Sequence, residues 1–141
     1  MGDRIGIFGG TFDPVHCGHL RAMVELRDEL ALNEVRVVPC GVPPHRAEPR
    51  ASAQARLAML DVALADLPGF SVDRRELERP GPSYMVDTLV SMRADWPEAA
   101  LWLLLGHDAF CTLPQWRRWR ELFSLANVGV ARRPGASVEA G

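Results

Sequence analysis

The stretch that decides the fold reads Arg4-Ile5-Gly6-Ile7-Phe8-Gly9-Gly10-Thr11-Phe12-Asp13-Pro14-Val15-His16-Cys17-Gly18-His19-Leu20. It is apolar and of strand type as far as Phe8, breaks at two glycines, turns at Asp13-Pro14 and continues into a helix. Glycine has no Cβ, so a ligand can approach the backbone there closely. The unpaired N–H groups of the first helical turn attract anions. The stretch therefore predicts a strand, a phosphate-binding loop and the start of a helix.

Two histidines, His16 and His19, stand at the start of this predicted helix, where a spacing of three places them on one face. Gly9-Gly10 alone could be a tight turn, and a lone histidine is more often structural than catalytic. A histidine pair directly after a strand and a Gly-Gly-Thr loop favours a shared phosphate. The segment could also be imagined as a zinc site, but no fourth ligand stands nearby, so we favour phosphate.

The composition is that of an ordinary globular domain. The chain has 141 residues, 48% of them hydrophobic and 24% charged, and a net charge of −2. We therefore expect one domain over residues 1–141, with no nucleic-acid or membrane partner. All 16 basic residues are Arg, which excludes a lysine nucleophile. Cys17, Cys40 and Cys111 form no Cys-x-x-Cys pair, and no signal peptide stands at the start, so we expect reduced thiols in a cytoplasmic protein.

Strand-like and helix-like segments alternate along the rest of the chain. This alternation predicts an α/β fold of the Rossmann-like, doubly wound type with a mainly parallel sheet, for which we expect the strand order 3-2-1-4-5. We expect Ser83 to cap the third helix and residues 74–82 to form a polar connection. A flavodoxin-like electron carrier shares this outline but has no use for the histidine pair. The predicted strands are residues 4–8, 35–39, 70–72, 102–105 and 128–131, and the predicted helices are 18–32, 52–66, 84–94, 109–113 and 118–125.

The segment from Gly6 to His19 resembles the signature of the nucleotidyltransferase superfamily that carries a His-x-Gly-His motif. Within that superfamily it is most similar to the nicotinate-nucleotide adenylyltransferases of bacteria. The resemblance implies that His16 and His19 are catalytic. It also implies contacts with ATP or its phosphates from Gly9, Gly10, Thr11, Phe12 and Gly18.

Two later motifs carry the same resemblance. Pro43-Pro44-His45-Arg46 matches a family loop, which implies that Arg46 contacts ATP and that His45 contacts the pyridine nucleotide. The segment from Ser83 to Leu89 resembles a family motif in which Tyr84, Met85 and Thr88 would line the pyridine-nucleotide site. The family usually has Thr where this chain has Met85, which leaves the preference for acid or amide open.

Three further matches follow in the order that the family shows. Gly106-His107-Asp108 implies that Gly106 and Asp108 bind the nucleotide, and Asp108 is also expected to cap the helix that follows. Leu113-Pro114-Gln115-Trp116-Arg117-Arg118-Trp119 implies that Trp116 stacks on the pyridine ring, whereas Trp119 is more often a core residue in such a pattern. Arg132-Arg133-Pro134-Gly135 implies that Arg133 meets the anionic substrate.

The family continues with a strand, an Ile-Ser-Ser/Thr-x-Ile-Arg motif and further helices, and residues 136–141 contain no such motif. We therefore expect the C-terminal part of the family fold to be absent from this chain.

The resemblance implies transfer of the adenylyl group of ATP to nicotinate mononucleotide in NAD biosynthesis, giving deamido-NAD and pyrophosphate. ATP implies Mg²⁺ bound to its phosphates, with no metal site built by the protein alone. Alternatives are a sibling enzyme acting on nicotinamide mononucleotide or phosphopantetheine, and a non-catalytic nucleotide-binding module. The sequence leaves a homo-oligomer open.

Overall fold

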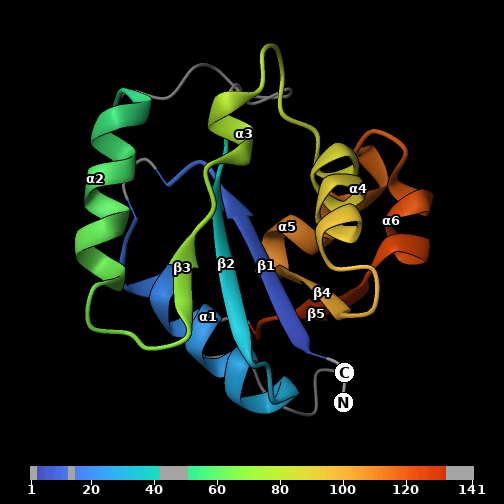
Figure 1. Ribbon diagram of the computed structural model, residues 1–141, viewed down its shortest axis with the longest axis horizontal. Coiled ribbons are helices and arrows are strands. Elements are labelled where there is room, and N and C mark those ends of the chain that lie inside the picture. The colour runs from blue at the N-terminus through green and yellow to red at the C-terminus, as the bar shows by residue number, and fades with distance from the viewer. Residues whose placement is uncertain (1–2, 13–14, 42–50, 133–141) are drawn as a thin grey trace.

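The computed structural model describes residues 3–12, 15–41 and 51–132. Over these residues the chain forms one five-stranded sheet in the order β3-β2-β1-β4-β5 (Figure 1). All four neighbouring pairs are parallel, as crossovers through helices require. The predicted strand order is confirmed. The strands are β1 (Arg4–Gly10), β2 (Glu34–Pro39), β3 (Phe70–Val72), β4 (Ala100–Leu105) and β5 (Asn127–Val130).

Helices cover both faces of the sheet, with α1 and α2 packed on one face and α4 and α6 on the other (Figure 1). This is the doubly wound arrangement that the alternation predicts. Among the described helices, none is long and apolar enough to cross a membrane. The helices are α1 (Cys17–Leu30), α2 (Ala53–Leu64), α3 (Arg75–Glu78), α4 (Met85–Asp95), α5 (His107–Cys111), the 3-10 turn η1 (Leu113–Gln115) and α6 (Trp119–Leu125).

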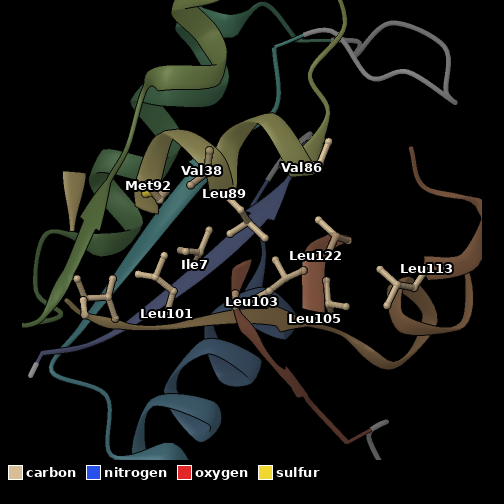
Figure 2. Close-up of a cluster of buried hydrophobic side chains, with 13 residues drawn as sticks. Ile7, Val38, Val86, Leu89, Met92, Leu101, Leu103, Leu105, Leu113 and Leu122 are labelled. Carbon is tan, nitrogen blue, oxygen red and sulfur yellow. The ribbon is translucent and has the colours of Figure 1, made fainter. Parts of the chain in front are cut away.

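Side chains of the central strands alternate between two cores, because successive residues of a strand point to opposite faces. Ile7 and Leu103 pack toward α4 and α6, where they meet Leu89 and Leu122 (Figure 2). Phe8, the next residue along β1, packs into the other core with residues of α1 and α2. Both faces of β1 and β4 are therefore buried, and only the ends of these strands are open to a ligand.

Two predicted helix caps are wrong. Ser83 is only 6% exposed, and its hydroxyl accepts the N–H of Gly41 at 3.2 Å, so the helix starts two residues later at Met85. Asp108 lies inside the first turn of α5, which Gly106 caps. A tertiary contact of Ser83 displaces the start of α4, and the end of β4 sets the start of α5. Residue type alone predicted other starts.

The polar connection predicted over residues 74–82 contains a short helix, α3. The Asp73 carboxylate, just before this helix, accepts hydrogen bonds from the backbone N–H of Arg75 at 3.0 Å and from its Nε at 2.9 Å. Four residues are too few to show an apolar period, which is why the sequence pattern missed this helix. It matters for the site because it carries Glu76.

Candidate active site

The ends of β1 and β4 lie side by side, and the chain leaves them in opposite directions, since β2 follows on one side and β5 on the other. Ligands of open α/β sheets bind at such a switch point. Two cavities open there, of about 440 and about 320 Å³, and we call them the first and the second cavity. They adjoin, because Phe8, Gly106, Asp108 and Ala109 line both.

The loop after β1 forms one wall of the first cavity through Gly9, Gly10 and Thr11. A Cβ on Gly9 would stand 2.6 Å from the Cε of Met85, so the absent side chain lets α4 approach the strand end. Phe12 lines neither cavity: its ring is 2% exposed and lies 5.0 Å from the His19 ring. The contact of Phe12 with ATP that the resemblance implied stays a prediction, and only the backbone of this residue could make it.

The two histidines fix each other at the start of α1. The N–H of His16 donates to the Nδ1 of His19 at 3.1 Å, and the N–H of Gly18 donates to the Nδ1 of His16 at 3.1 Å. The rings stack with their centroids 3.8 Å apart. Because each Nδ1 accepts a hydrogen bond, each neutral ring carries its proton on Nε2. Both rings line the second cavity together with Gly18, so the pair can present two N–H donors to one anion.

The pKa of His19 is lowered to about 4, first by burial and then by the neighbouring His16. A buried imidazole loses hydration when it is charged, and a second histidine nearby disfavours a second charge. At neutral pH, His19 is therefore a neutral hydrogen-bond donor, which can bind developing negative charge without a change of protonation.

The opposite wall of the first cavity is aromatic, formed by Tyr84 and Trp116 with Met85 beside them. The Nε1 of Trp116 donates to the Thr112 hydroxyl at 3.1 Å, which fixes the plane of the indole. The guanidinium carbon of Arg117 lies 4.7 Å from the centre of the Tyr84 ring. Flat, polarisable side chains with a cation at their edge fit a flat ring that bears an anionic group. Trp119 does not line either cavity and packs against the core.

A buried carboxyl group, that of Glu76 on α3, also lines the first cavity, although no sequence motif indicated it. Burial raises the pKa of Glu76, an effect that the Thr88 hydroxyl and the Arg79 guanidinium partly offset. No local pattern marked this residue, because its place depends on a helix of four residues.

Thr88 is 0% exposed and lines neither cavity. Its hydroxyl contacts the Glu76 carboxylate and accepts a hydrogen bond from the Nη2 of Arg79 at 2.6 Å. The structure thus places Thr88 behind the cavity wall, which corrects the direct contact with the pyridine nucleotide that the motif implied: its side chain reaches the cavity only through Glu76.

Gly106 and Asp108 stand where the two cavities meet, and His107 lines the second cavity only. Arg132, two residues after the end of β5, also lines the second cavity, although the motif match had pointed to its neighbour Arg133. Within the described part of the chain, no group of three or more His, Cys, Asp and Glu side chains could hold a metal ion. The predicted site residues His45, Arg46 and Arg133 lie outside the described residues.

Comparison with known proteins gives a family. The model of the family described as "Cytidylyltransferase-like" matches residues 7–139. A relative from Methylococcus capsulatus is 57% identical over 136 residues, which are 96% of this chain and 65% of the relative, and one from Laribacter hongkongensis is 58% identical over 132 residues, which are 93% of this chain and 60% of the relative. Both bear the name "Probable nicotinate-nucleotide adenylyltransferase".

The chain spans between 60% and 65% of the length of these two curated relatives. Among solved structures, a Plasmodium falciparum nicotinic acid mononucleotide adenylyltransferase complexed with NaAD superposes with a TM-score of 0.76. It is 17% identical, and the match covers 96% of this chain and 77% of that one. At this identity the likeness concerns the fold.

Proposed function

Because the chain belongs to the cytidylyltransferase-like family, we propose that it transfers the adenylyl group of ATP to nicotinate mononucleotide. A phosphate oxygen of the mononucleotide attacks the α-phosphorus of ATP, and the bond from that phosphorus to the bridging oxygen of the β-phosphate breaks. The products are deamido-NAD and pyrophosphate, and we assign the reaction to NAD biosynthesis in the cytoplasm. The observation that carries the proposal is the meeting of an aromatic cavity and a histidine cavity at one strand edge.

The first cavity is the proposed site of the pyridine nucleotide. A pyridine ring fits against Trp116, whose plane the Thr112 hydroxyl fixes, and stacking on such a ring contributes about 0.5–1.5 kcal/mol beyond the buried area. The backbone near Trp116 and the exposed guanidinium of Arg117 are the proposed partners of the nicotinate carboxylate. Arg117 has no carboxylate partner among the described residues, so its charge is available to a ligand.

The second cavity is the proposed site of the reacting phosphates. His16 and His19 each hold an Nε2–H, and such donors bind the charge that builds up on phosphate oxygens in the transition state. No covalent intermediate is needed, because the phosphate of the acceptor is itself the nucleophile. Catalysis then rests on position and on charge stabilisation, for which holding both substrates at one edge is the main requirement.

ATP is proposed to bind as its Mg²⁺ complex, in which the ion neutralises phosphate charge. Mg²⁺ prefers oxygen ligands and is usually held by phosphates with one or two carboxylates. Asp108 fits this need, since its exposed carboxylate stands where the two cavities meet. His45, Arg46 and Arg133 stay proposed substrate contacts on the strength of their motifs alone.

Pyrophosphate release with ATP and Mg²⁺ tests the proposal, with nicotinate or nicotinamide mononucleotide as the second substrate. We expect turnover with the acid form. Preference for the amide would favour the sibling activity that Met85 leaves open, and ATP binding without turnover would favour a nucleotide-binding module. Because the curated relatives are longer than this chain, one of them assayed in parallel is the positive control.

A further inference from the structure

Arg56, on α2, is 2% exposed and reaches across to two segments that are distant in sequence. Its Nη1 donates to the carbonyl of Thr11 at 2.9 Å and to the carbonyl of Cys40 at 2.7 Å. Thr11 follows β1, Cys40 follows β2, and both line the first cavity. One buried guanidinium thus joins the two loops that leave the central strands at the edge where the ligands are proposed to bind.

The tie to Thr11 fixes one particular peptide group. The Thr11 carbonyl belongs to the peptide that continues to Phe12, and Phe12 has a φ of 51°. A large non-glycine residue keeps such a left-handed backbone only when its surroundings hold it there. The buried Phe12 ring is one such restraint, and the Arg56 hydrogen bond is a second.

The same tie sets the direction of the Phe12 N–H. In a trans peptide the C=O and the N–H point in opposite directions. With the Thr11 carbonyl turned inward to Arg56, the Phe12 N–H turns away from that guanidinium. Among residues 3–12, 15–41 and 51–132, no acceptor is bonded to this N–H. The Cys40–Gly41 peptide is different, because Arg56 holds its carbonyl and the Ser83 hydroxyl accepts its N–H at 3.2 Å.

Besides joining the two loops, Arg56 places a buried positive charge beside them. Burying a guanidinium is costly, and within the described residues Arg56 forms no ion pair and its buried Nε has no partner. The cation bonds a peptide whose N–H has no partner among the described residues. This peptide stands between the two cavities, because Thr11 lines the first and the Phe12 ring lies 5.0 Å from the ring of His19, which lines the second. We infer that Arg56 is a positioning residue for ATP: it holds the Thr11–Phe12 peptide so that the Phe12 N–H is presented to a phosphate. This inference rests on the proposed function.

The test compares Arg56→Gln with a matched variant, Arg93→Gln. Arg93 also binds two backbone carbonyls, donating to Ala99 before β4 at 2.6 Å and to Leu125 at the end of α6 at 2.9 Å, but none of these three residues lines the first or the second cavity. Both variants are expected to unfold at a lower temperature than the wild type. Two readouts separate positioning from stability: the affinity for Mg²⁺–ATP, measured by calorimetry, and the shift of the Phe12 amide resonance on adding Mg²⁺–ATP.

We expect Arg56→Gln to bind Mg²⁺–ATP roughly tenfold more weakly, about the effect of one hydrogen bond, and to lose the ligand-induced shift of the Phe12 amide. Arg93→Gln should retain both. Affinity within about twofold of the wild type and an unchanged Phe12 shift in Arg56→Gln would overturn the inference. If that variant does not fold, Arg56→Lys decides by the same readouts, because it keeps the charge with a single nitrogen. A wild-type protein that binds no ATP would refute the proposed function itself, before any variant is compared.

Discussion

The two cavities adjoin at one edge of the sheet, yet side chains of different kinds line them. The first is walled by Tyr84, Trp116 and a buried carboxyl group, whereas the second is lined by a histidine pair and by Arg132. One wall suits a flat ring and the other suits phosphate oxygens. Under the proposed function, changes in the aromatic wall of the first cavity should act on substrate affinity, and changes in the histidine pair of the second cavity should act on turnover.

The largest effect is expected from His19→Ala, in the second cavity. It removes an Nε2–H donor from the reacting phosphates, and losing one such donor typically lowers kcat by about 10²–10³. KM values should change little, since the donor acts on charge that develops during the reaction. Rates of pyrophosphate release at saturating substrates measure this. The matched control is His107→Ala, which empties part of the same cavity and should leave kcat nearly unchanged. Equal kcat in the wild type and His19→Ala would break the contrast between the cavities.

A smaller effect, on KM and not on kcat, is expected from Trp116→Ala in the first cavity. Loss of stacking should raise KM for nicotinate mononucleotide by about two- to twelvefold, the range that corresponds to about 0.5–1.5 kcal/mol. KM for ATP and kcat should stay close to the wild-type values. Trp116→Phe keeps an aromatic face and should restore most of the affinity. A fall in kcat without a change in KM would place Trp116 in the chemistry instead.

A further prediction sharpens what the first cavity selects. Arg117→Gln should lower the preference for nicotinate over nicotinamide mononucleotide by up to about fivefold, since an exposed ion pair contributes about 0.2–1 kcal/mol. The ratio of the two kcat/KM values measures it. Arg118→Gln is the neighbouring control, because Arg118 pairs with Glu121 and lines neither cavity. An unchanged ratio in Arg117→Gln would leave acid recognition to the backbone near Trp116.

The smallest expected effect is on the pH dependence of the unfolding free energy. His19 in the second cavity and Glu76 in the first change it in opposite directions. The pKa of His19 is about 4 in the folded protein against 6.5 when unfolded, so the unfolded chain binds the proton first and stability falls as pH drops from 6.5 toward 4. The pKa of Glu76 is raised above 4.5, so its contribution is lost as pH rises above 4.5.

Unfolding temperatures between pH 4 and pH 7 test both signs. His19→Gln should flatten the acid side of the profile, and Glu76→Gln should raise the unfolding temperature most at the neutral end. Arg93→Gln, which lowers stability without removing a titrating group in this range, should shift the whole profile and keep its shape. A profile that Glu76→Gln leaves unchanged would mean that the carboxyl group titrates normally.

Local patterns were sufficient for the strands and for the outline of the site. The apolar run ending at Gly9-Gly10 and the apolar run ending at Leu105 both became central parallel strands, because uninterrupted β-branched and leucine-rich runs are stable where both faces are buried. The histidine spacing also sufficed to place His16 and His19 together at the start of α1, where both line the second cavity. These features depend on neighbours within a few residues, which a sequence displays directly.

The alternation of strands and helices and the two kinds of residue at the site could therefore be predicted from the sequence. Which side chains line the two cavities depended on tertiary contacts. These contacts placed Thr88 behind the wall, brought Glu76 into the first cavity and bound Arg56 to Thr11 across 45 residues. Such placements depend on contacts between segments that are far apart in the chain, and no local period or propensity encodes them. The same physical reason explains why Ser83, a good helix cap by type, bonds Gly41 instead.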